Sequence, residues 1–86
     1  MPYIKQELRD ELDPHIDAII DILYPRGPQG KGMFNYIIYR LHKALFPPDY
    51  GSIADGIGTI VCSALEIYRR RMVERETEAI KENGDI

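Results

Sequence analysis

Proline and glycine divide this chain of 86 residues into three blocks, and each block has the spacing of apolar residues found in helices. The breaks fall at residues 25–32 and 47–51, where proline cannot donate to a helical ladder and glycine weakens it. No block shows the sustained alternation of apolar and polar residues that indicates a half-buried strand. The sequence therefore predicts an all-α fold, and its length leaves room for one domain over residues 1–86.

The first block is expected to contain two helices. Asp13 followed by Pro14 is typical of a helix start, because Asp can cap and Pro fits the first helical position. A short helix is thus predicted over residues 6–12, and a second helix from residue 14 carries an apolar stripe at one-turn spacing.

The other two blocks each predict one helix. Residues 24–32 contain too much glycine and proline for a helix and are expected to form a mobile surface loop, followed by a helix over 33–46. Ser52 is the expected N-cap of a last helix that runs to about residue 81, with Asn83-Gly84 as its stop. The sequence predicts a small antiparallel bundle of three main helices plus the short N-terminal helix.

The last predicted helix has more apolar surface than one chain can cover. Its apolar arc takes up nearly half of the helical wheel, which is wider than packing on one neighbour requires. Beside the arc, Ala54, Gly58 and Cys62 form a track of small residues along which another helix could approach closely. The helix would be on the order of 45 Å long, whereas a compact chain of this size is about 30 Å across. These features predict a homo-oligomer.

Composition excludes several classes of function. Eleven Lys and Arg against fourteen Asp and Glu give a net charge of -3, so we expect no binding to nucleic acid. The longest apolar stretch, residues 57–68, is shorter than the roughly 20 residues of a membrane span and contains Glu66. The single cysteine cannot form an internal disulfide, and the first residues lack the apolar region of a signal peptide, so a cytoplasmic location is expected.

Four segments of the sequence resemble a family of small uncharacterised bacterial, archaeal and phage proteins described as a domain of unknown function. They are MPYIK at residues 1–5, NYxIxRL at 35–41, CxxLExYRR at 62–70 and KENGD at 81–85. The resemblance spans nearly the whole chain and implies no known activity. Glu74 and Arg75 stand where the family pattern has Pro-Tyr, which favours a continuous last helix here.

Two groups of polar residues are candidate sites for a ligand or a partner. The polar face of the predicted middle helix combines hydrogen-bonding groups and flat rings, in Asn35, Tyr36, Tyr39, Arg40 and His42. Such a face suits a subunit or protein interface, although a solvated face or a small-molecule site would use the same residues. Glu66 is predicted to pair with Arg70 one turn away, and if that face is buried in an oligomer Glu66 would need a cation such as Arg69, Arg70, Arg40 or a metal.

The leading functional hypothesis is a homo-oligomeric interaction or scaffolding module without a cofactor. A second hypothesis is a small metal-dependent hydrolase of nucleotides, with Asp17, Asp21 and Glu66 as magnesium ligands. A third is a regulator that binds an anion through Arg40, Arg69 and Arg70. Structural zinc is not expected, because the chain has one cysteine, two histidines and no closely spaced ligand pairs.

Overall fold

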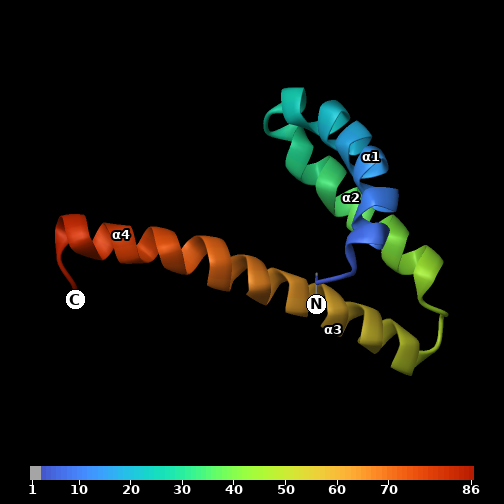
Figure 1. Cartoon of the computed structure of the whole chain (residues 1–86). Coiled ribbons are helices and arrows are strands. Elements are labelled where there is room, and N and C mark those ends of the chain that lie inside the picture. The colour runs from blue at the N-terminus through green and yellow to red at the C-terminus, as the bar shows by residue number, and fades with distance from the viewer. Residues whose placement is uncertain (1–2) are drawn as a thin grey trace.

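The computed structural model describes residues 3–86, and this part of the chain is mostly helical and contains no strands (Figure 1). The all-α prediction is confirmed. The elements in chain order are α1 (Gln6–Leu23), a short 3-10 turn η1 (Tyr24–Arg26), α2 (Gln29–Leu45), α3 (Tyr50–Ile67), a π-helical turn η2 (Tyr68–Met72) and α4 (Val73–Asn83).

The first block forms one helix rather than two. Pro14 lies inside α1, where it removes one hydrogen bond but does not end the helix. The apolar residues Leu8, Leu12 and Ile16 keep one-turn spacing on both sides of the proline. A continuous helix places them all on one face, and this outweighs the lost hydrogen bond. The prediction of a separate N-terminal helix was therefore wrong.

The segment predicted as a loop over residues 24–32 is a tight turn that leads directly into α2. Gly27 has a φ of 58°, a conformation that favours glycine, and α2 starts two residues later. Gly30 lies in the first turn of α2, where a Cβ atom would come within 3.3 Å of the Leu23 carbonyl oxygen. The close approach allows α1 and α2 to form an antiparallel hairpin, as Figure 1 shows.

An elbow separates α2 from α3. Phe46 is extended, with φ of -117° and ψ of 123°, and the prolines that follow it cannot continue the helix. Asp49 caps α3 in place of the predicted Ser52, because its carboxylate accepts a hydrogen bond from the Ser52 backbone N–H at 2.9 Å. This bond holds the pKa of Asp49 below its usual value.

His42 joins the two sides of the elbow. Its Nε2 lies 3.1 Å from the carbonyl oxygen of Ile53, and its ring stacks on Phe46 with 5.2 Å between centroids. Gly56 is buried beneath these two rings. The start of α3 is thus packed on the end of α2, and the remainder of α3 points away from the hairpin (Figure 1).

The last three elements form one long rod, α3–η2–α4. It ends at Asn83, two residues beyond the predicted end, and Gly84 stops it with a φ of 85°. The π turn inserts one extra residue in the helical register. Tyr68 and Glu76 are thereby brought onto one face, where the tyrosine hydroxyl donates to the Glu76 carboxylate at 3.0 Å, and this contact raises the pKa of Tyr68.

The single chain has no hydrophobic core. Gly56 is the one buried residue among residues 3–86, and no large apolar side chain in that range is buried. The radius of gyration is 16.4 Å, against about 12 Å for a compact chain of this length. The predicted three-helix bundle does not form within one chain, because the elbow keeps α3 out of contact with α1.

Candidate functional site

A cluster of four polar residues ties the N-terminal segment to the middle of the rod. The Tyr3 hydroxyl donates to Glu66 Oε1 at 2.5 Å and accepts a hydrogen bond from Arg70 Nε at 2.7 Å. Arg69 Nη2 donates to the same Glu66 oxygen at 2.5 Å, and the Arg70 guanidinium lies over the Tyr3 ring, 5.2 Å from its centroid. We call Tyr3, Glu66, Arg69 and Arg70 the tyrosine clamp.

The tyrosine clamp keeps Glu66 ionised. Hydrogen bonds from Arg69, Tyr3 and Arg70 to the carboxylate lower the pKa of Glu66 to about 2. The same contacts raise the pKa values of both arginines, chiefly through Glu66 for Arg69 and through Tyr3 for Arg70. A carboxylate with so low a pKa cannot serve as a general acid near neutral pH. The clamp therefore has the character of a structural tie between the chain start and the rod.

The ion pair between Glu66 and Arg70 was predicted from the sequence, and the structure has it at 3.1 Å. The role of Tyr3 was not predicted. It acts across more than sixty residues of sequence, and helical periodicity carries no signal for a contact over that separation.

Only some of the predicted polar residues of α2 contact one another. Arg40 Nη1 donates a hydrogen bond to the Tyr36 hydroxyl at 3.0 Å. Asn35 and Tyr39 are both exposed. His42 belongs to the elbow rather than to this face. Arg40 lies on α2 and is not brought to the arginines of the tyrosine clamp, so the three-arginine anion site is not assembled.

The structure does not gather the predicted magnesium ligands. Asp17 and Asp21 lie on α1, whereas Glu66 lies in the tyrosine clamp. Over residues 3–86, no three His, Cys, Asp or Glu side chains lie close enough together to hold a metal ion.

The track of small residues on α3 meets no other helix in the described part of the chain. Cys62 is exposed, and a Cβ atom at Gly58 would meet nothing within 4 Å. The glycine with a packing role is Gly56, which lies under the elbow rings.

A large apolar groove runs along the α1–α2 hairpin, with a volume of about 690 Å³. We call it the hairpin groove. Its apolar lining comes from both helices: Ile16, Ile19, Ile20 and Leu23 from α1, and Phe34, Ile37 and Leu41 from α2. Within the described chain no segment fills it, and side chains such as Ile20 and Phe34 remain 50% and 56% exposed.

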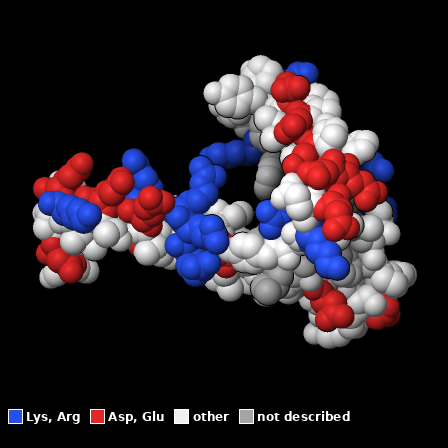
Figure 2. Space-filling view, in the orientation of Figure 1, with Lys and Arg blue, Asp and Glu red and all other residues white. Residues whose placement is uncertain are grey.

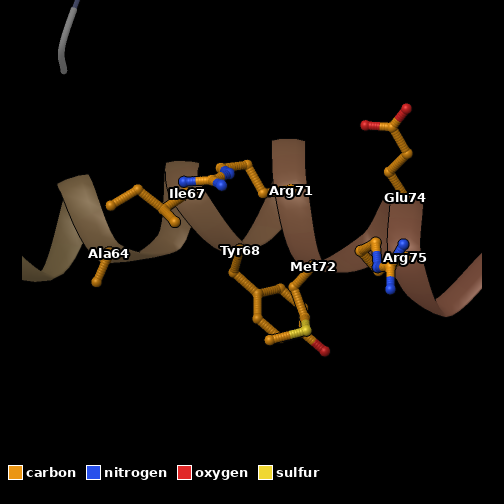
Figure 3. Close-up of a pocket in the computed structure, with 7 residues that line it drawn as sticks. All are labelled: Ala64, Ile67, Tyr68, Arg71, Met72, Glu74 and Arg75. Atoms are coloured by element: carbon orange, nitrogen blue, oxygen red, sulfur yellow. The ribbon is translucent and has the colours of Figure 1, made fainter. Parts of the chain in front are cut away.

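A second apolar surface surrounds the π turn. Figure 3 shows Ala64, Tyr68 and Met72 on one side of the rod, whereas Ile67, Arg71 and Glu74 project from the other side. Tyr68 and Met72 are about half exposed, at 49% and 50%. We call this the rod face.

No helix in the described part of the chain is both long enough and apolar enough to cross a membrane.

A model of the family Domain of unknown function (DUF6899) matches residues 1–86, the whole chain. The chain belongs to this family. Neither a curated protein nor a solved structure matches it. Membership of DUF6899 implies no known activity, so a function has to be inferred from the geometry of the helices and their uncovered surfaces.

Proposed function

We propose that this DUF6899 protein is a helical interaction module that acts as a homo-oligomer. The observation that carries the proposal is the area left exposed by the single chain, 7896 Å². A folded monomer of this mass has about 5,200 Å² of accessible surface. The excess is therefore about 2,700 Å² per chain, and much of it comes from isoleucine, leucine, tyrosine and phenylalanine side chains.

Two chains that covered this excess would together bury about 5,400 Å², which is at the upper end of obligate interfaces. Permanent homodimers bury about 2,000–5,000 Å² in total, and their interfaces resemble a domain core cut in half. Monomeric proteins seldom expose a contiguous apolar patch of more than a few hundred Å². The hairpin groove and the rod face are two separate apolar surfaces that the described chain leaves uncovered.

The chain cannot cover these surfaces by closing on itself. Movement of α3 into the hairpin groove would break the His42 contact with Ile53 and expose Gly56. Such a movement would also break the tyrosine clamp, in which Tyr3 bonds to Glu66 and Arg70 of the rod. A second copy of the chain offers the same apolar surfaces and supports a closed, symmetric assembly.

Sedimentation equilibrium of the full-length protein at micromolar concentration tests the proposal. The expected result is a mass of two or more chains, without a detectable monomer. A monodisperse folded monomer of 9.9 kDa would overturn it. The double variant Arg40→Glu with Lys43→Glu, on the polar face of α2, is a control for net charge and is expected to keep the wild-type mass.

A further inference from the structure

We propose that a pocket beside the tyrosine clamp binds the phosphate group of a small molecule. This proposal goes beyond the homo-oligomer and does not rest on it. The pocket lies between the start of the chain and the rod and has a volume of about 370 Å³, within the range of small-molecule sites. We call it the arginine pocket, because its lining includes three arginines, Arg9, Arg70 and Arg71, against a single carboxylate.

Two of these arginines are held by hydrogen bonds that leave their outer nitrogens available. Arg9 Nε donates to the Ile4 carbonyl oxygen at 2.9 Å. Arg70 Nε donates to the Tyr3 hydroxyl at 2.7 Å and to Glu66 Oε1 at 3.1 Å. Neither guanidinium bonds through Nη1 or Nη2 to another atom in the described part of the chain. The fold thus orients both groups and leaves free the amines with which arginine binds phosphate oxygens.

Arg71 brings a third guanidinium to the same pocket. It makes no ion pair within residues 3–86. Figure 3 shows its side chain running back along the rod toward Ile67, which also lines the arginine pocket, whereas Glu74 points away from it. Figure 2 shows basic residues gathered at the middle of the rod. Positive charge is therefore concentrated at this place in a chain whose net charge is -3.

Glu66 lines the arginine pocket as well, but its charge is already compensated. Its Oε1 accepts hydrogen bonds from the Tyr3 hydroxyl and from Arg69 Nη2, both at 2.5 Å, and its side chain is only 21% exposed. Arg69 is outside the pocket lining and balances the charge of Glu66. The charges of Arg9 and Arg71 are not balanced in this way, so the pocket attracts an anion.

The chemistry of the lining favours phosphate over other anions. A carboxylate has two oxygens and is satisfied by one guanidinium, whereas a phosphate group has oxygens for several guanidinium groups at once. The hydroxyl of Ser63, also in the lining, is a further donor. The side chain of Ile67 and the ring of Tyr3 give the pocket an apolar part, which suits a group attached to the phosphate.

Titration of the full-length protein with sodium phosphate tests the proposal, followed by NMR of the arginine Nε–H signals. Sodium chloride at the same ionic strength is the reference. Saturable shifts are expected at Arg9, Arg70 and Arg71 with phosphate but not with chloride. Arg9→Gln and Arg71→Gln are each expected to raise the phosphate Kd about fivefold, because each removes one charged contact to the anion. Far-UV circular dichroism shows whether each variant keeps its helices.

Arg75→Gln is the matched control. It removes the same charge from the same rod, one turn beyond Arg71, but Arg75 does not line the arginine pocket. Its Kd for phosphate is expected to change less than about twofold, since salt screens an exposed charge at that distance. Tyr3→Phe leaves the net charge unchanged and removes the hydroxyl that bonds to Arg70, so it is expected to raise the Kd as well. A diffuse attraction to positive charge would not respond to Tyr3→Phe.

Two phosphate esters distinguish the sources of the phosphate group. Phenyl phosphate and AMP are titrated in the same way as inorganic phosphate. Tighter binding of an ester supports a ligand whose attached group also contacts the pocket, and equal affinities support free phosphate as the ligand. The proposal is overturned if phosphate gives no saturable shift, if chloride gives the same shifts, or if Arg75→Gln weakens binding as much as Arg71→Gln.

Discussion

Gly56 and Gly58 provide the sharpest test of the elbow, because they lie in the same helix and differ only in what surrounds them. Gly to Ala in an exposed helix interior stabilises by about 1 kcal/mol, since alanine has the higher helix propensity. A Cβ atom at Gly58 would meet nothing within 4 Å. Gly58→Ala is therefore expected to stabilise the protein by about 1 kcal/mol, which raises the Tm by about 4–8 °C.

Gly56→Ala is expected to have the opposite sign. A Cβ atom at Gly56 would lie 2.8 Å from Phe46 Cδ2 and closer still to the His42 ring, so both rings would have to move. Overpacking of this kind costs about 1–3 kcal/mol and exceeds the gain in helix propensity. Thermal unfolding of both variants at one protein concentration measures the difference. If Gly56→Ala stabilises as much as Gly58→Ala, the elbow is not packed as described above.

Three further predictions concern local contacts. Glu66 stabilises the fold while it is ionised, and because its pKa is lowered to about 2, that stability is lost as the pH falls from 4.5 toward 2. Acid titration of the Tm should therefore be shallower in Glu66→Gln than in the wild type over that range, and equal slopes would contradict the role of the tyrosine clamp. Tyr3→Phe removes the hydroxyl that contacts Glu66 and Arg70, so amide exchange at Lys5 and the first turn of α1 should accelerate; unchanged rates would be inconsistent with the tie. Asp49→Ala removes the cap of α3 and should lower the Tm, measured by circular dichroism, by about 5 °C. Asp49→Ser keeps a capping side chain and should lower the Tm much less.

The helices could be predicted from periodicity and from helix-breaking residues, but their boundaries could not. Pro14 is typical of a helix start, and the sequence does not reveal that the apolar stripe across it would be the stronger influence. Ser52 and Asp49 are both good caps, and the choice between them depends on where Pro47 and Pro48 turn the chain. These helix boundaries depend on packing between distant parts of the chain, and the local sequence pattern carries no information on that packing.

Part of the tyrosine clamp was predictable and part was not. Glu66 and Arg70 are one turn apart on a helix, so their pairing follows from spacing alone. Tyr3 joins them only because the hairpin brings the start of the chain back to the rod. The role of His42 at the elbow depends in the same way on the angle between α2 and α3.

The central claim is that this chain folds with its apolar surfaces covered by another copy. Thermal unfolding over a hundredfold range of protein concentration tests it most directly, because association that stabilises the folded state makes the Tm depend on concentration. The account predicts a rise of about 3–5 °C for each tenfold increase in concentration. A sharp, cooperative transition at one temperature across the whole range would contradict it.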